Sequence, residues 1–224
     1  MPDHDVLSTE TRVLHLRSQL PRADRPAEFA DDLCFTSELV AAFVDAYTVP
    51  GDLVFDPFTG FGTALRSAEE MGRRALGFEI DENRVAFARS QVADPTWVQR
   101  MDVRQADWSS VPRFQLSITS PPYMTRQDHE EDPLGGYRTL DGDYSRYLSD
   151  LQQIYRGISD RAAGPDARLI VNVANLHGTR LAWDVGTSLA EVLSFEREIV
   201  IDWDRPQDWF TQDYCLVFRP GQPG

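Results

Sequence analysis

The sequence contains no lysine: all 22 of its basic residues are arginine, against 36 aspartate and glutamate residues, for a formal net charge of −14. A chain this acidic is repelled by phosphate overall, which disfavours nucleic acid as a partner unless a local basic patch exists. Acidity without lysine is also typical of adaptation to salt or of a GC-rich genome. Under that interpretation the charge says little about the partner.

Cysteine is scarce as well, and Cys34 and Cys215 both stand in apolar surroundings. We interpret them as small core residues rather than a disulfide. No Cys/His cluster has zinc spacing, so we predict no metal site. No apolar run is long enough to span a bilayer, and the first residues lack the basic and apolar segments of a signal peptide. We therefore expect a cytoplasmic protein without membrane association.

Strand-like and helix-like segments alternate along the 224 residues, which suffice for one α/β domain. The pattern predicts strands near 53–55, 75–78, 114–118, 169–173, 198–203 and 214–218, and a further strand within 97–106 that ends near Asp107. It predicts helices near 37–47, 63–71, 82–92, 144–161 and 181–193. This order indicates a mostly parallel sheet with an antiparallel terminal strand pair at its edge. We expect an N-terminal extension over residues 1–25 and a single domain over 26–220.

The most informative stretch is Thr119-Ser-Pro-Pro-Tyr123, which follows the expected strand at 114–118. Open α/β sheets carry their chemistry at the carboxyl ends of the strands. Two consecutive prolines remove two backbone donors, so this turn offers carbonyl acceptors beside the Ser120 hydroxyl and the Tyr123 ring. Such a turn can bind a flat, conjugated amine, with hydrogen bonds to the Pro121 carbonyl and Ser120 and stacking on Tyr123.

A second signature is the stretch from Asp52 to Thr63, a strand followed by a glycine-rich turn and the start of a helix. Gly60 and Gly62 allow a tight turn and close approach of a ligand. Glu79 ends the next expected strand, roughly 20 residues further on, where nucleotide-binding folds place an acid for a ribose diol. An acid there disfavours a 2′-phosphate and so argues against NADP.

With these motifs the chain resembles the S-adenosylmethionine-dependent amino-methyltransferases, most closely the DNA N4-cytosine and N6-adenine methylases. Their catalytic tetrapeptide is Ser/Asp/Asn-Pro-Pro-Tyr, and the serine form is usual in the N4-cytosine branch. The resemblance covers roughly residues 26–220 and implies the class I methyltransferase (Rossmann-like) fold. Many N4-cytosine enzymes of restriction systems have the catalytic motif first, whereas here the cofactor motif precedes it.

The resemblance implies roles for individual residues. The catalytic residues would be Ser120, Pro121, Pro122 and Tyr123. The residues that bind S-adenosylmethionine would be Phe35, Asp56, Pro57, Phe58, Gly60, Gly62, Thr63, Glu79 and Asp107. Some alternatives stay open: Thr63 can simply cap its helix, Phe35 can staple the following helix, and Asp102 competes with Asp107 as the ligand of the adenine amine. Trp108 fits the adenine site or the core equally well.

The substrate implied by the resemblance is an exocyclic amino group of a nucleic-acid base, with DNA favoured over RNA. A restriction-modification role is the corresponding expectation. The domain leaves no room for a separate target-recognition domain, so a partner subunit could supply sequence choice. RNA, a protein amide or a small amine is the alternative, and the acidic stretch Asp128–Asp132 would suit a cationic substrate. A non-catalytic subunit that binds the cofactor is the alternative from another class.

Overall fold

The computed structural model describes residues 7–8, 10–18, 36–124, 131–136, 142–205 and 210–221. Its strands are β1 (Val13–Leu16), β2 (Leu53–Asp56), β3 (Arg74–Glu79), β4 (Val98–Arg100), β5 (Leu116–Thr119), β6 (Arg168–Leu176), β7 (Ser194–Trp203) and β8 (Phe210–Arg219). Its α-helices are α1 (Ser37–Tyr47), α2 (Thr63–Glu70), α3 (Glu82–Gln91), α4 (Tyr144–Asp160) and α5 (Leu181–Ala190). Among these helices, none has the length and apolar character needed to cross a membrane.

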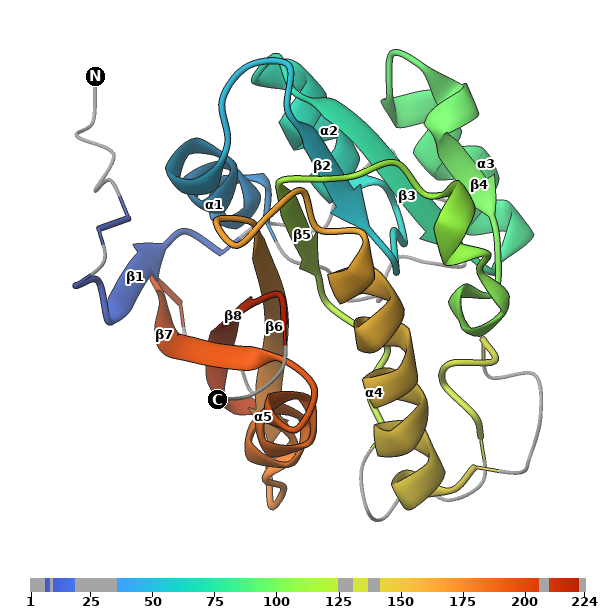
Figure 1. Ribbon diagram of the computed structural model, residues 1–224. Helices are drawn as coiled ribbons and strands as arrows, with labels where there is room; N and C mark the ends of the chain where they lie inside the picture. Colours follow the sequence, from blue (N-terminus) through green and yellow to red (C-terminus); the bar gives the residue numbers. More distant parts are fainter. Residues whose placement is uncertain are drawn as a thin grey trace.

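The described strands form one sheet of eight, in the order β1-β7-β8-β6-β5-β2-β3-β4 (Figure 1). Neighbouring strands are parallel, except that β8 runs antiparallel to both β6 and β7. The predicted mostly parallel sheet with an antiparallel terminal strand is therefore confirmed. Its placement at the edge was wrong, because β8 lies between β6 and β7 and the edge on that side is formed by β1.

The edge strand β1 comes from the segment expected to be an extension. Leu14 and Leu16 point into the core, whereas Val13 is 44% exposed, so its four residues alternate as a half-buried strand does. The sequence pattern is too short to separate such a strand from a loop. Its parallel partner β7 lies near the other end of the chain, so no local signal announces the pairing. The proposed boundaries of the extension and the domain stay predictions.

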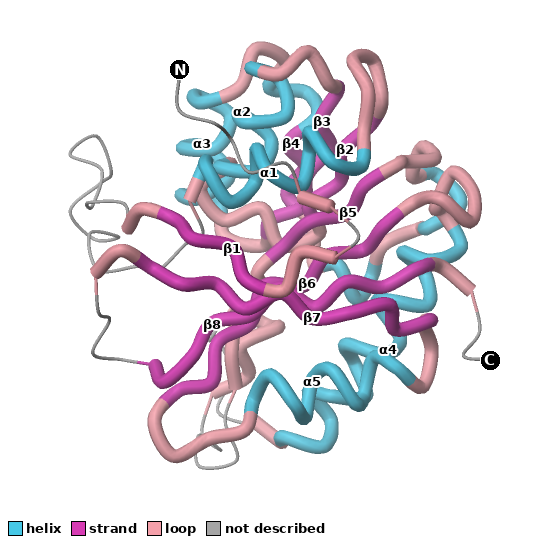
Figure 2. The backbone as a smooth tube through the Cα atoms, turned by 90° about the vertical axis from the view of Figure 1, so that its left-hand side faces the viewer, coloured by secondary structure: helices cyan, strands magenta, loops and turns pink. Residues whose placement is uncertain are grey.

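Helices cover both faces of the sheet, with α1, α2 and α3 on one side and α4 and α5 on the other (Figure 2). Successive residues of a strand serve opposite faces, as the pleat requires. Val54 and Ile170 pack into the core beneath α1 and α2, whereas Phe55 and Leu169 pack into the core beneath α4. This layering buries both faces of the central strands and fixes the positions of the loops at their carboxyl ends.

The third predicted strand lies within residues 97–106 as expected, but its expected end near Asp107 was wrong. The structure ends β4 at Arg100, and two short 3-10 helices follow: η3 (Val103–Gln105) and η4 (Trp108–Ser110). Each is capped by the acid before it, since Asp102 accepts from the backbone N–H of Arg104 and Asp107 from that of Ser109. Such local bonds compete with the strand ladder, which is why the strand stops early. A third short 3-10 helix, η2 (Pro95–Trp97), precedes β4.

Candidate active site

The carboxyl ends of β2, β3, β4 and β5 meet at one edge of the sheet because these strands are parallel neighbours. Backbone hydrogen bonds tie the loops that follow them. The N–H of Thr59, after β2, donates to the Phe78 carbonyl in β3 over 2.8 Å. The N–H of Met101, after β4, donates to the Glu79 carbonyl over 2.9 Å. The glycine-rich turn and the predicted ribose acid are therefore adjacent, and β5 brings the Ser-Pro-Pro-Tyr turn to the same edge.

The glycine-rich turn is bound directly to Glu79. The N–H of Gly60 donates to Glu79 Oε2 over 2.8 Å, and the N–H of Asp81 donates to Oε1 over 2.8 Å. Gly60 and Gly62 have φ of 53° and 80°, a region that glycine adopts without strain. Burial raises the pKa of Glu79, while these backbone donors and Arg84 oppose the shift. The acid thus anchors the turn from a buried position.

Gly77 is a residue of the site that the sequence analysis did not single out. A Cβ on Gly77 would lie 2.0 Å from Thr59 Oγ1 and 2.6 Å from Leu65 Cδ1. The turn after β2 can therefore sit on β3 only because position 77 has no side chain. The available signal was a glycine inside an apolar strand, which often marks close approach of another segment.

Asp56 lies at the end of β2 and is almost completely buried, at 1% exposure. Its Oδ1 accepts hydrogen bonds from Thr119 Oγ1 over 2.6 Å and from the N–H of Phe58 over 3.1 Å. Burial, together with the nearby Glu79 carboxylate, raises the pKa of Asp56 to about 7, against the opposing effect of the Thr119 and Phe58 donors. This acid therefore changes its charge near neutral pH.

Other predicted residues of the turn are placed as follows. Pro57 is buried and Phe58 half-buried beside Asp56. Thr63 is the first residue of α2, and Gly62 occupies the cap position without a side-chain cap bond. The interpretation of Thr63 as a helix cap was therefore wrong. Phe35 lies outside the described residues, as does Cys34.

The acid at the end of β4 is Asp102, not Asp107. Asp102 stands two residues after Arg100, the last residue of β4, and its side chain is 14% exposed. Asp107 is exposed and accepts from the N–H and the hydroxyl of Ser109, which lowers its pKa. The strand-end position assigned to Asp107 is thus corrected, because the strand is shorter than its apolar pattern indicated.

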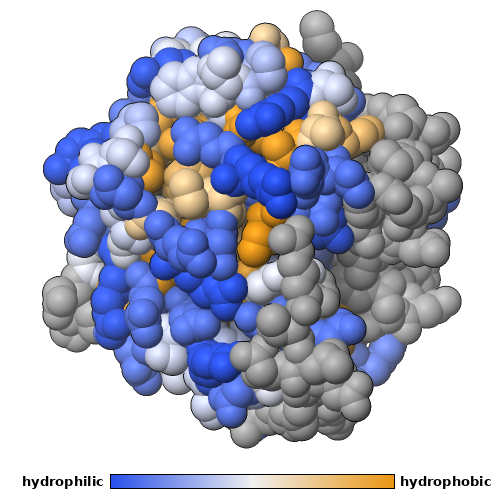
Figure 3. Space-filling model, turned by 90° about the vertical axis from the view of Figure 1, so that its right-hand side faces the viewer, coloured by the Kyte–Doolittle hydropathy of each residue, from blue (hydrophilic) through white to orange (hydrophobic). Residues whose placement is uncertain are grey.

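Trp108 packs against the core, which is one of the two positions that the sequence left open. Its ring meets the Phe55 ring edge-on at 6.4 Å, and a Cβ on Gly157 would lie 2.1 Å from its Nε1. The ring thus fills space between β2 and α4. Viewed from the side of α3 and β4, the described surface is mostly hydrophilic, with apolar residues between the polar ones in its upper part (Figure 3).

Arg104 links the end of β4 to the loop that follows the Ser-Pro-Pro-Tyr turn. Its guanidinium lies 2.8 Å from Asp102 Oδ2, 2.8 Å from Asp132 Oδ2 and 4.0 Å from Asp150 Oδ2 in α4. These acids raise the pKa of Arg104 further. Arg104 therefore holds Asp132 beside the end of β4, whereas residues 128–130 of the predicted acidic stretch lie outside the described residues. In the described part of the chain, no cluster of His, Cys, Asp and Glu could hold a metal ion.

The Ser-Pro-Pro-Tyr turn is anchored on β6 through its tyrosine. The N–H of Ala174 donates to the Tyr123 hydroxyl over 3.1 Å, and Ser120 Oγ lies 3.4 Å from that hydroxyl. Burial raises the pKa of Tyr123, so the phenol stays protonated. The Tyr147 hydroxyl donates to the Pro122 carbonyl over 3.1 Å, whereas no described residue donates to the Pro121 carbonyl. The Pro121 carbonyl therefore remains as an acceptor for a ligand.

A second buried acid, Asp213 in β8, lies close enough to raise the pKa of Tyr123. It accepts from Asn172 Nδ2 over 2.8 Å and from Trp203 Nε1 over 3.1 Å. Burial raises the pKa of Asp213 to about 6. The sequence offered no motif for this acid, because its neighbours come from β6 and β7.

We expect Asp213 to make the protein less stable as the pH rises. An acid whose pKa is higher in the folded state binds its proton more tightly there, so its stabilising effect is complete below about pH 4 and disappears as the pH rises past about 6. Thermal unfolding between pH 5 and 7 should show a loss of roughly 1 kcal/mol from this residue. Asp213→Asn should lack that loss, whereas the matched exposed variant Asp107→Asn should keep it. If the free energy of unfolding changes with pH equally in the wild type and in Asp213→Asn, the raised pKa of Asp213 is contradicted.

Known proteins match this chain in sequence over limited stretches. Residues 17–90 match a family model described as DNA methylase. Over 46 residues the chain is 41% identical to the type II methyltransferase M.MthZI of Methanothermobacter thermautotrophicus, which covers 20% of this chain and 13% of that protein. Over 101 residues it is 30% identical to the tRNA (guanine(10)-N(2))-methyltransferase TRMT11 of Xenopus laevis, covering 35% of this chain and 21% of that protein. The chain therefore matches only a small part of these relatives.

The fold is shared over most of the chain. The magnesium protoporphyrin IX methyltransferase ChlM of Synechocystis PCC 6803, solved with bound SAM, superposes with a TM-score of 0.54 and 16% sequence identity. The superposition covers 83% of this chain and 78% of that one. It shows that the two chains share the class I methyltransferase fold. The resemblance to DNA methylases that the sequence suggested is confirmed over residues 17–90, and the chain has the class I methyltransferase fold.

Proposed function

We propose that this chain is an S-adenosylmethionine-dependent methyltransferase that acts on an exocyclic amino group of a nucleic-acid base. DNA cytosine N4 is the favoured target, followed by adenine N6. The observation that carries the proposal is the Ser-Pro-Pro-Tyr turn at the end of β5, with Thr119 bound to Asp56 at the end of β2 over 2.6 Å. The candidate amine site and the candidate cofactor turn thus share a buried hydrogen bond.

The residues at the ends of β2, β3 and β4 fit S-adenosylmethionine chemically. Asp56 Oδ2 accepts no hydrogen bond from the described residues, and a carboxylate there would suit the ammonium of the methionine end. Glu79 would hold the ribose hydroxyls. Asp102, rather than Asp107, would accept the adenine amine, beside the half-buried Met101. When bound, the cofactor supplies a methyl group on a positively charged sulfur.

The Ser-Pro-Pro-Tyr turn would prepare the amine for methylation. The lone pair of a cytosine or adenine amine is delocalised into its ring, so the nitrogen is a poor nucleophile. Hydrogen bonds from the amine to the Pro121 carbonyl and to Ser120 Oγ favour a pyramidal nitrogen whose lone pair is exposed. The Tyr123 ring, held by Ala174, would stack on the base. Positioning and fixed dipoles account for most of the rate in such a site.

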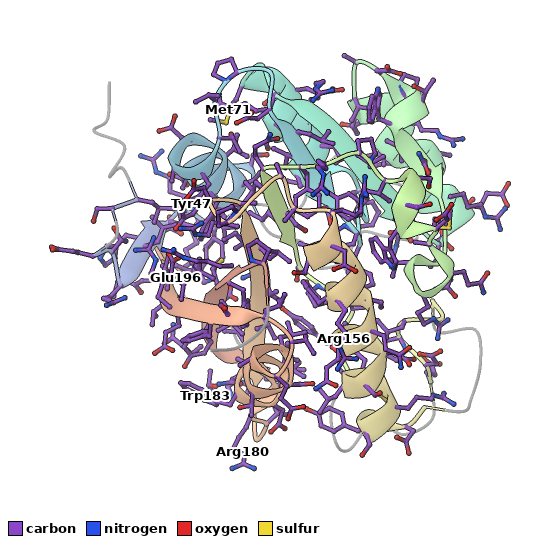
Figure 4. The ribbon with its side chains drawn as sticks, viewed as in Figure 1. Tyr47, Met71, Arg156, Arg180, Trp183 and Glu196 are labelled. Carbon is purple, nitrogen blue, oxygen red and sulfur yellow. The ribbon has the colours of Figure 1, made fainter. Side chains whose placement is uncertain are left out.

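A nucleic-acid substrate is supported by the family match and by an aromatic pair at the same edge of the sheet. Trp183 in α5 is 51% exposed, and its ring lies 5.8 Å from that of Tyr214. Arg180 and Trp183 lie together at the end of the molecule where α4 begins (Figure 4). Exposed aromatic rings bind unstacked bases without relying on phosphate contacts, which suits a net charge of −14.

RNA is the second candidate substrate, because the chain is 30% identical over 101 residues to a tRNA guanine methyltransferase. The restriction-modification role rests on relatives described as type II methyltransferases, which the chain matches over 13% to 16% of their length. A partner subunit that supplies sequence choice and the cytoplasmic location both stay predictions.

Methyl transfer from labelled S-adenosylmethionine to unmethylated DNA and to unmodified RNA, followed by nucleoside analysis, tests the proposal. We expect label in N4-methylcytosine or N6-methyladenine. Label in RNA alone would select the second candidate, and label in neither polymer, with the cofactor bound, would overturn the nucleic-acid assignment.

Trp183→Ala should raise the KM for the polymer severalfold and leave cofactor affinity unchanged, whereas Trp183→Phe should stay near wild type.

A further inference from the structure

The buried hydrogen bond between Thr119 and Asp56 joins the two functional turns. Thr119 is fully buried and Asp56 is 1% exposed, and 2.6 Å separate Thr119 Oγ1 from Asp56 Oδ1. The two residues end neighbouring parallel strands, β5 and β2. Thr119 also directly precedes Ser120, so this hydrogen bond connects the Ser-Pro-Pro-Tyr turn to the acid of the other turn.

This hydrogen bond also fixes the orientation of the Asp56 carboxylate. Oδ1 accepts from both Thr119 Oγ1 and the N–H of Phe58, whereas Oδ2 accepts from no described residue. A carboxylate held by two donors on one oxygen presents its other oxygen in a defined direction. Without the threonine hydroxyl, one backbone donor would remain and the group could rotate about that contact.

Burial and one charged neighbour oppose the ionisation of Asp56. Glu79, on β3, adds a second negative charge. Tyr155, on α4, has a buried hydroxyl without a hydrogen-bond partner, and the Asp56 charge contributes to raising the pKa of this phenol. No described cation lies within salt-bridge distance of Asp56. The hydroxyl of Thr119 is therefore the largest stabilising influence on the charged carboxylate, ahead of the Phe58 N–H.

We propose that Thr119 is a positioning residue that orients Asp56 and favours its charged form, and that it thereby couples binding of a cationic ligand at the glycine-rich turn to the geometry of the Ser-Pro-Pro-Tyr turn. The identity of that ligand as the methionine end of S-adenosylmethionine rests on the proposed function. The link between Thr119 and Asp56 does not, and it can be measured without any ligand.

Carboxyl carbon-13 NMR of the ligand-free, full-length protein tests the link directly. The Asp56 resonance is assigned by its loss in Asp56→Asn, and its titration is followed from pH 4.5 to 9. Thr119→Val should raise the midpoint by about one pH unit, because a hydrogen bond to a charged group is lost. Thr119→Ser should restore the wild-type midpoint. Thr48→Val, which removes a buried hydroxyl at the end of α1, is the matched control and should leave the midpoint unchanged.

Calorimetric binding of S-adenosylmethionine across the same pH range tests the coupling. Thr119→Val should bind about tenfold more weakly at pH 7, with the midpoint of the affinity profile shifted upward; Thr119→Ser should bind as wild type does. If Thr119→Val does not fold, Thr119→Ala replaces it in both measurements. An Asp56 midpoint that is the same with and without the hydroxyl overturns the proposal. Absence of binding by the wild type, with the NMR shift present, overturns the proposed function and leaves the Thr119–Asp56 link standing.

Discussion

Replacing Tyr123 by alanine is expected to lower the rate of methyl transfer by about 10²-fold or more. The phenol ring would supply the stacking surface for the target base, and its hydroxyl holds the turn on β6 through the N–H of Ala174. Loss of both leaves the Pro121 carbonyl and Ser120 Oγ without a defined geometry. Single-turnover assays with saturating S-adenosylmethionine measure the rate, and calorimetry should show cofactor affinity within about twofold of wild type.

Tyr123→Phe separates the two contributions. The ring remains, but the Ala174 N–H loses its acceptor and Ser120 loses its neighbour at 3.4 Å. We expect a loss of about tenfold, from a less rigid turn rather than from missing stacking. If phenylalanine proves as damaging as alanine, the hydroxyl is the essential group. A fully active alanine variant would remove Tyr123 from the catalytic set.

Gly77→Ala is expected to destabilise the fold and weaken cofactor binding together. The added Cβ would lie 2.0 Å from Thr59 Oγ1, which donates to the Asp56 carbonyl and so is not free to move. Overpacking of this kind costs about 2 kcal/mol or more, and its relief requires the turn after β2 to shift away from β3. Urea unfolding measures the stability, and calorimetry should show at least a tenfold loss of S-adenosylmethionine affinity.

Gly164→Ala is the matched control, because a Cβ at position 164 meets nothing within 4 Å. It should change the free energy of unfolding by less than about 0.5 kcal/mol and leave binding unchanged. A Gly77→Ala protein with wild-type stability and reduced affinity would show that the turn after β2 shifts without loss of stability and that only cofactor binding is weakened. Wild-type behaviour in both measurements would contradict the role given to Gly77.

Much of the fold could be predicted because its signals are local. Alternating apolar residues, glycines and capping acids gave the central strands and the five helices within a few residues. The prediction failed where the apolar pattern was short, or where local side-chain caps competed with strand pairing. The strand at 97–106 was cut to three residues by the caps of Asp102 and Asp107, and β1 pairs with a strand near the other end of the chain.

The residue types of Ser120–Tyr123 and the glycines near Asp56 predict an amine site and a nucleotide-type turn, and this prediction needs no knowledge of the contacts between strands. Which of their groups remain available for a ligand depends on the folded arrangement. It engaged the Pro122 carbonyl with Tyr147, exposed Asp107, and brought Thr119 against Asp56. Burial and cross-strand contact decide these outcomes, and both depend on residues far apart in the chain.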